Sequence, residues 1–529
     1  MRKQSYRLLI IILLGIVIYS CQKEDEILPL NEENINQIQV DGIIKLGKKL
    51  ENPYSVENMQ RALENLKKSN VSAKTTTSGL NVETTHLYVK FIPKNEDELS
   101  ILKRDPTFVL YEYPLDYEIA EGGYFYRDPE VPKGQPTYQY CAVKVDKKLP
   151  SGVENEILEE LFIPDEDNND DATSRKAFSY GNVEALVDEA LRITNNLPNT
   201  DLQNQKSLFA RRSKWRPAGT IRVWDDNFSS WIGVEGVEVR ARRWFTTHKG
   251  IANSSGYYSC DGRFRRDANY SIDWERYHFT LQDGWLNGAT FNGSKKRGNW
   301  DLNLNSGAQQ YYATIFRAAY HYYYKDIKGL RRPPQNSFWK TQMKIKAALQ
   351  DEGGCGGSAS AACHTSFWRA FGLYSPIRIY TYQRPAIFTY ATTIHELAHA
   401  SHWKMENSIT GNFNSISSKV KESWARGVQW ELGRMTYPNY LGREFKTNDY
   451  TLVVSDMIDD DFGVDEDEHP RTNKGYYNDP NDQVSGYTIR QIEDALVDQK
   501  TWNDWRDNII RKYTNSTEDN LNRLFRAYE

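Results

Sequence analysis

The sequence predicts a multidomain α+β protein. Its 529 residues are too many for one hydrophobic core, so we expect about two to four domains. Mixed helix-like and strand-like segments come first, strand-like alternation dominates residues 217–305, and helical spacing dominates from residue 308. We therefore expect a small α+β N-terminal domain, a β-sandwich middle domain and a mainly helical C-terminal domain with a small sheet.

The composition describes a polar-surfaced protein. Mean hydropathy is −0.72 and the net charge is only −4. So small a charge gives no argument for nucleic acid or anionic lipid as a partner. Aromatic residues make up 13% of the chain, which suits either a sugar- or peptide-binding surface or a larger core.

The first 21 residues have the pattern of a targeting segment. A basic start precedes an apolar run from Leu8 to Tyr19, which is too short to span a bilayer. The run ends in Ile18-Tyr19-Ser20-Cys21, which resembles a bacterial lipobox. The resemblance implies that Cys21 is lipidated and anchors the protein at the outer membrane or cell surface of a Gram-negative bacterium. A plain secretory signal is the alternative.

The next segments predict a tether and then a folded domain. Residues 22–42 are polar and acidic, as expected for a tether off the membrane. Residues 43–160 alternate between helical and strand patterns, with strands expected over Thr85–Ile92 and Phe108–Tyr113. No set of residues in this α+β domain suggests chemistry, so we expect it to support the structure, contact a partner or cover another domain.

Residues 161–216 predict an acidic linker with a short helix at Val183–Thr194. The run Pro164–Asp171 offers carboxylate oxygens that suit Ca²⁺, but it lacks the spacing of an EF-hand loop. A second acidic run, Asp456–Glu468, raises the same question. A solvated loop is the competing interpretation of both runs.

Residues 217–305 read as short strands separated by turns. The segments Gly219–Asp225, Gly236–Val239 and Gly256–Tyr258 resemble the carboxypeptidase regulatory-like, transthyretin-type β-sandwich. The resemblance implies a module that accompanies and orients an enzyme and carries no catalytic residue itself.

Four cysteines remain after Cys21, and an exported protein can form disulfides. Cys355 and Cys363 flank a glycine-rich stretch that can close easily, so they are the candidate bridge, with two free thiols as the alternative.

From residue 308 the pattern becomes helical. Tyr311–Ile327 has apolar residues at helical spacing, and His321 within it is expected to be a hydrogen-bonded buried histidine. Met343–Leu349 and Pro376–Tyr382 look like strands. Ile377–Tyr382 is a candidate edge for pairing with an extended peptide, or a merely structural strand.

The segment Thr392–Ala400 contains the most informative motif, His-Glu-x-x-His. Two histidines four residues apart lie on one face of a helix, so His395 and His399 can bind one Zn²⁺. Glu396 then lies beside the open metal position and can take a proton from water.

A catalytic zinc needs a third protein ligand. His402 lies on the same helix face, but at about 1.5 Å per residue it falls roughly one turn beyond His399. We expect the third ligand to be Glu422, on a second helix that follows a polar loop; Glu431 and Glu406 are the alternatives.

His395, Glu396, His399 and Glu422 together resemble the gluzincin zinc peptidases over about 220 C-terminal residues. The resemblance implies hydrolysis of protein or peptide substrates, with Glu396 as general base and Tyr487 or His469 as the group that stabilises the tetrahedral intermediate. Many gluzincins carry an aspartate four residues after the glutamate, to orient the first histidine. This chain has Arg426 there, so another group must fill that role.

These observations predict a lipid-anchored, zincin-like metallopeptidase that hydrolyses extracellular proteins or glycoproteins. Two other functions fit the sequence less fully. One is a catalytically silent zincin-fold binding lipoprotein, which would not need Glu396. The other is a self-processing factor whose N-terminal domain acts as a prosegment.

Overall fold

The computed structural model of the protein describes most of the chain, with a mixture of about 35% helix and 26% strand in several small sheets. It describes residues 43–69, 81–123, 125–132, 134–164, 180–197, 213–282, 288–336, 342–349, 362–364, 376–406, 413–440, 442, 449–459 and 483–529. Cys21, the tether, Cys355 and His469 lie outside these residues, as do residues 165–171 of the first acidic run and most of the second. Only the backbone of Cys363 is described. The predictions for these segments stay predictions.

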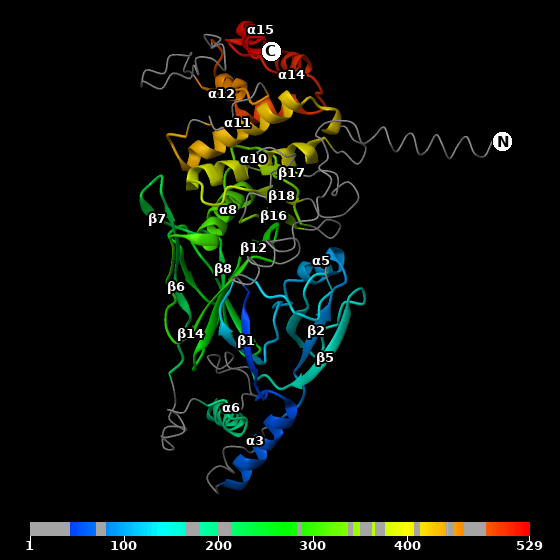
Figure 1. Ribbon diagram of the computed structural model, residues 1–529, viewed down its shortest axis with the longest axis vertical. Coiled ribbons are helices and arrows are strands. Elements are labelled where there is room, and N and C mark those ends of the chain that lie inside the picture. The colour runs from blue at the N-terminus through cyan, green and yellow to red at the C-terminus, as the bar shows by residue number, and fades with distance from the viewer. Residues whose placement is uncertain are drawn as a thin grey trace, which may run out of the picture.

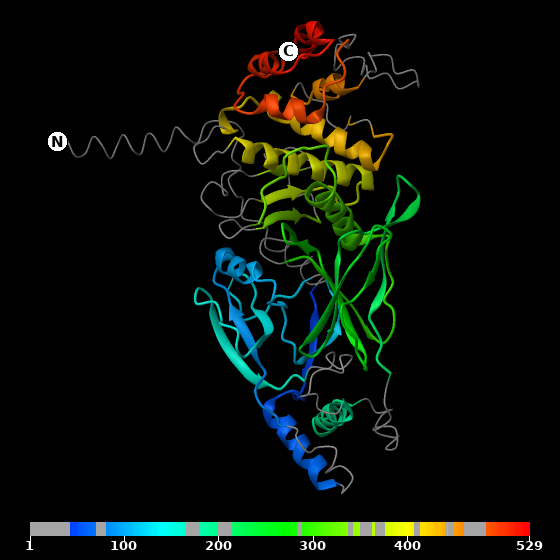
Figure 2. The ribbon, with the colours of Figure 1, turned by 180° about the vertical axis from the view of Figure 1, so that it is seen from behind.

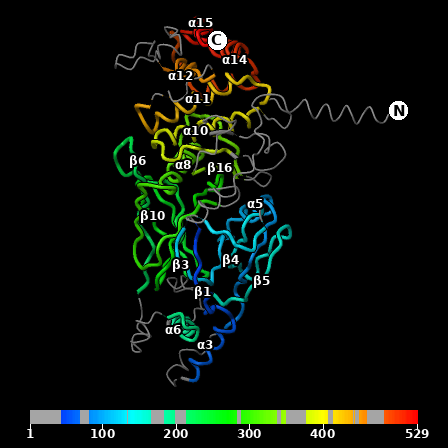
Figure 3. The backbone as a smooth tube through the Cα atoms, viewed as in Figure 1, coloured from blue at the N-terminus to red at the C-terminus, as the bar shows by residue number. Residues whose placement is uncertain are grey.

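The molecule is elongated, with α10–α15 at one end and α3 and α6 at the other (Figures 1 and 3). Among the described residues, no helix is both long enough and apolar enough to cross a membrane.

The N-terminal unit, residues 43–197, combines helices with two small antiparallel sheets. Its three-stranded sheet has the order β4-β2-β5, and β1 pairs with β3. The elements are β1 (Lys45–Lys49), α3 (Val56–Ser69), β2 (His86–Ile92), α5 (Glu96–Arg104), β3 (Tyr117–Glu121), β4 (Gln139–Lys144), β5 (Glu154–Leu161) and α6 (Tyr180–Ile193). Helices α3 and α6 pack through leucines of one core.

The strand expected over Phe108–Tyr113 does not form. Only an isolated bridge joins Tyr111 to Tyr140. The Tyr111 hydroxyl lies 2.9 Å from the Thr247 hydroxyl, and the Tyr113 hydroxyl donates to Asn292 at 3.1 Å. Contacts with the neighbouring unit therefore override the strand propensity of this segment.

The middle of the chain forms two four-stranded sheets, here called the two-sheet unit (Figure 2). One has the order β10-β6-β15 with β7 beside β6, and the other the order β14-β11-β8-β9. The strands are β6 (Ala218–Asp225), β7 (Ser230–Gly233), β8 (Glu238–Arg243), β9 (Thr246–Ile251), β10 (Tyr257–Ser259), β11 (Ala268–Asp273), β14 (Thr290–Lys296) and β15 (Leu302–Leu304). Buried residues alternate along β6, and Ile221 and Val223 share one core with Val239 and Ile272.

A five-stranded sheet joins the middle of the chain to the C-terminal part. Its order is β12-β13-β16-β18-β17, with β13, β16 and β18 parallel and β17 antiparallel at the edge. The strands are β12 (Glu275–Arg276), β13 (Phe279–Gln282), β16 (Met343–Ala347), β17 (Ala362–His364) and β18 (Pro376–Ile379). The sheet takes strands from both sides of the boundary expected near residue 305. It also shows that β18 lies inside the sheet, so the prediction that Ile377–Tyr382 forms the edge is wrong.

Helices cover this sheet and extend beyond it to the end of the chain (Figure 1). They are α8 (Gly307–Tyr324), α10 (Ala386–Met405), α11 (Ser418–Thr436), α12 (Val453–Ile458), α13 (Ile489–Leu496), α14 (Trp502–Lys512) and α15 (Leu521–Ala527), with short 3-10 turns at Phe413–Ser415 and Glu518–Asn520. One continuous core contains residues of these helices, of the five-stranded sheet and of the two-sheet unit.

The end of β6 and the turn after it contact α8, the start of α10 and the residue that follows α11. The fully buried Asp225 carboxylate accepts hydrogen bonds from Arg317 of α8 at 2.9 Å and from the Tyr437 hydroxyl, just after α11, at 2.7 Å. Asp226 accepts from the backbone N–H of Ala386, the first residue of α10, at 2.8 Å. The two-sheet unit thus fixes the start of α10, whose N-cap residue is a proline that forms no side-chain capping bond.

Candidate metal centre

Helix α10 carries the His-Glu-x-x-His motif through the interior of the protein. Ile394, Leu397, Ala398 and Ala400 are fully buried, as expected for a helix packed on both sides. It lies between α8 and α11. The motif is therefore held by packing rather than displayed on a surface.

Helix α11 supplies the predicted third ligand. It starts after Ser417, whose side chain accepts a hydrogen bond from the Val420 N–H. Glu422 follows in the second turn and reaches toward α10, with 15% of its side chain exposed.

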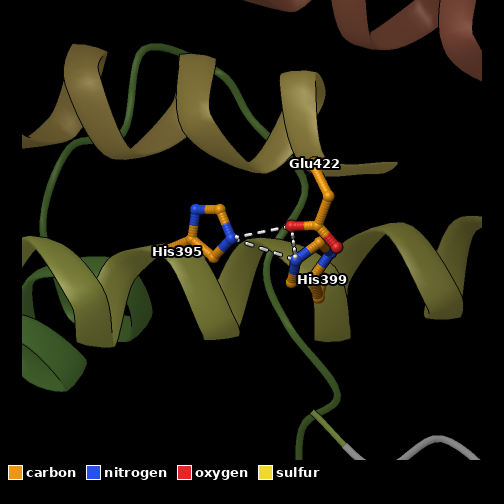
Figure 4. A group of neighbouring side chains, drawn as sticks. All are labelled: His395, His399 and Glu422. Carbon is orange, nitrogen blue, oxygen red and sulfur yellow. Dashed lines mark hydrogen bonds and ion pairs between the residues drawn. The ribbon is translucent and has the colours of Figure 1, made fainter. Parts of the chain in front are cut away.

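His395, His399 and Glu422 converge on one point (Figure 4). Glu422 Oε2 lies 3.2 Å from His395 Nε2 and 3.0 Å from His399 Nε2, and the two Nε2 atoms are 3.1 Å apart. In the part of the chain that the structure describes, these three side chains form the group of histidine, cysteine or acidic residues whose donor atoms lie close enough together to hold a metal ion. The structure therefore brings together the three ligands expected from the sequence.

The spacing of these atoms fits a tetrahedral ion. An ion about 2.0 to 2.1 Å from each ligand atom separates those atoms by about 3.3 to 3.4 Å, close to the observed triangle. Two imidazole nitrogens and one carboxylate oxygen form a donor set that binds zinc and other transition metals. Three protein ligands leave the fourth position for water or substrate.

Glu422 and His399 shift each other's pKa. Burial alone would raise the pKa of Glu422, but the charge of His399 and hydrogen bonds from both histidines hold that pKa well below its usual range. Burial lowers the pKa of His399, against the opposing effect of Glu422. Glu422 is therefore a carboxylate, the form in which a glutamate binds a metal.

Gln429 orients the first histidine. Its side-chain oxygen accepts a hydrogen bond from His395 Nδ1 at 2.9 Å, which leaves the Nε2 lone pair for the metal. Its side-chain nitrogen donates to the Tyr440 hydroxyl at 2.6 Å, which fixes the amide. Gln429 therefore fills the role that the sequence left open at Arg426.

Glu396 is buried beside the ligand group, with 4% of its surface exposed. Burial and the negative charge of Glu422 raise its pKa well above the usual range. No described protein group hydrogen-bonds its buried Oε2. This carboxyl group holds its proton more strongly than an exposed glutamate and can exchange it with a water or a substrate at the centre.

Tyr450 belongs to the centre and was not predicted. Its ring lies 5.7 Å from the His395 ring, stacked at 23°. Burial, the nearby charges of Glu422 and Glu396, and a hydrogen bond with Glu422 raise the pKa of the Tyr450 hydroxyl, so it remains a donor. It packs on one ligand and hydrogen-bonds another.

Tyr487, a candidate for stabilising the intermediate, lies elsewhere. The N–H of Tyr487 donates to the Met457 carbonyl at 3.0 Å and its charged neighbour is Glu518, so the structure does not bring Tyr487 to the ligand group. His469 lies outside the described residues.

The alternative ligands are used for other contacts. His402 is fully buried, 3.6 Å from Glu406, and Glu431 pairs with Lys328 and Arg434. His321 is confirmed as a buried, hydrogen-bonded histidine: its Nδ1 lies 2.6 Å from the Tyr390 hydroxyl.

A comparison with known proteins finds no family model, no curated protein and no solved structure that matches this chain.

Proposed function

We propose that this protein is a zinc-dependent endopeptidase of gluzincin type, held at the surface of a Gram-negative bacterium by a lipid on Cys21. One observation carries the proposal. The donor atoms of His395, His399 and Glu422 form a triangle of tetrahedral size, with the Glu396 carboxylate buried beside it. The substrates would be extracellular proteins or glycoproteins, as the surface location implies.

Each group at the centre has its own role in hydrolysis. Zinc held by the three ligands would act as a Lewis acid, lowering the pKa of water and polarising the scissile carbonyl. Glu396 takes a proton from the attacking water and delivers it to the leaving amine. Gln429 and Tyr450 hold His395 and Glu422 in position through the contacts described above.

The edge strand β17 offers a place for an extended substrate. In the described chain it pairs on one side only, with β18, and it lies next to α10. A peptide paired with the other side of β17 would form backbone hydrogen bonds with it. The two-sheet unit fits the accessory role of a carboxypeptidase regulatory-like sandwich, since it anchors α8, α10 and α11.

Zinc content tests the centre. The chain lacking residues 1–21 is expected to hold one zinc per molecule, and Glu422→Gln is expected to lose it. Glu431→Gln is the matched control, because it changes a buried glutamate of the same helix outside the ligand group. Absence of zinc in the wild-type protein after incubation with the metal would refute the centre and favour the binding lipoprotein.

Glu396→Gln tests the reaction. This variant is expected to keep its zinc and to lose cleavage of a protein-substrate library by about 10²-fold or more. Cleavage that is unchanged would show that another group transfers the proton.

A further inference from the structure

A cavity lies between the N-terminal unit and the sheet β14-β11-β8-β9. It encloses about 230 Å³. Its walls come from the loop after α5, from strands β8, β9 and β11, and from the segments at β12 and at the start of β14. Among the described lining residues none belongs to α10 or α11, so this cavity is separate from the metal centre.

Three basic and three acidic side chains line the cavity and form a network of ion pairs. Lys103 Nζ lies 2.9 Å from Glu275, Lys249 Nζ lies 3.1 Å from Glu238, and Arg240 contacts Asp273. The three acidic side chains are each 24% exposed, so part of each side chain remains accessible. The two lysines are 21% and 28% exposed.

The remaining charged residues of the wall add charges of both signs. Asp105 pairs with Lys147 at 2.6 Å, and the Arg276 guanidinium, a further positive charge, lies over the Tyr324 ring at 5.9 Å. Burial raises the pKa of Glu112 to about 8, so this side chain is mostly uncharged at neutral pH. The wall of the cavity is therefore polar and carries charges of both signs.

Size and an exposed aromatic ring narrow the choice of ligand. A cavity of about 150 Å³ holds benzene, so this one has room for a single six-membered ring with small substituents. Tyr277 lines the cavity and is 50% exposed, so part of its ring is available for contact. The face of an aromatic side chain packs against the apolar face of a ligand ring, and the paired charged groups can hydrogen-bond the polar groups at the edge of that ring.

We propose that this cavity binds one neutral pyranose sugar, either free or at the end of a glycan. Sugar hydroxyls both donate and accept hydrogen bonds, so they can use the exposed carboxylates and ammonium groups together. A ligand of either charge would meet a like charge within the cavity. The inference does not depend on the metal centre.

Calorimetric titration of the full chain tests the proposal. The probes are glucose, galactose, mannose and N-acetylglucosamine, each also as its methyl glycosides, with glucuronate, glucosamine and lysine as charged probes. At least one neutral pyranose is expected to bind saturably. Retained binding of its methyl glycoside would point to a glycan end, and loss of binding would point to the free sugar.

Tyr277→Ala is expected to weaken that binding roughly three- to tenfold. Tyr257→Ala is the matched control, because Tyr257 is a tyrosine of similar exposure, 48%, on β10 of the two-sheet unit and does not line the cavity. Both variants should retain wild-type zinc content, which separates a failure here from a failure of the proposed peptidase. Binding of charged probes only, no binding of any pyranose, or equal loss in both variants would overturn the proposal.

Discussion

Replacing Gln429 by leucine tests whether a glutamine does here what an aspartate does in many gluzincins. The change removes the acceptor that lies 2.9 Å from His395 Nδ1 and leaves a side chain of similar size. Losing such an orienting hydrogen bond typically weakens metal binding about 10- to 100-fold, which is about 1.4 to 2.7 kcal/mol. The ring of His395 would lose its fixed tautomer, although its stacking on Tyr450 would remain.

The zinc affinity of Gln429→Leu is measured by competition with a chromogenic chelator. Gln429→Glu is expected to retain most of the affinity, because a carboxylate also accepts the His395 N–H. Gln309→Leu is the matched control: Gln309 is a buried glutamine of α8 that accepts from the Trp274 indole at 2.7 Å, away from the centre. An affinity for Gln429→Leu within about twofold of wild type would refute the orienting role.

Three further predictions concern stability. Asp225→Asn is expected to lower the free energy of unfolding, measured in urea, by about 3 to 5 kcal/mol, because it leaves the buried Arg317 without its countercharge. Asp301→Asn is the control, because Asp301 is exposed, and it should lower this free energy by less than about 0.5 kcal/mol. Gly427→Ala is expected to lower the free energy of unfolding by about 1 to 3 kcal/mol, because the new Cβ would lie 2.3 Å from Val454. The cost of this clash exceeds the gain of roughly 1 kcal/mol in helix propensity, and a rise in melting temperature would contradict the prediction. Burial lowers the pKa of His321 from 6.5 to about 4, so the unfolded chain takes up the proton first as the pH falls. His321 should therefore remove about 2 kcal/mol of stability between about pH 7.5 and about pH 5, a loss that His321→Gln should lack.

The three ligands could be predicted because their positions follow from residue spacing within two successive helices. Four-residue spacing places His395 and His399 together on any helix, and a second helix after a short loop brings Glu422 back to them. Gln429 follows the same logic and was missed. Helices α10 and α11 run antiparallel here. Glu422 contacts His399, and Gln429, which comes later on α11, contacts His395, which comes earlier on α10.

Tyr450 had no such signal. It lies on a segment after α11, and only tertiary packing brings its ring to His395. The failed strand at Phe108–Tyr113 has the same cause, since hydrogen bonds from Tyr111 and Tyr113 to the two-sheet unit replace the expected ladder. The edge position of β17 depends on strand order, which residue patterns within one strand do not encode.

The shared five-stranded sheet also limits how the protein can be divided. A fragment starting near residue 308 would take β16 without β13, its parallel neighbour, and would leave a row of unpaired backbone groups on a strand that is buried in the whole protein. It would also lack the aspartate that caps α10. Such a fragment should aggregate on expression, so moving the metal centre into another protein requires the two-sheet unit to be included.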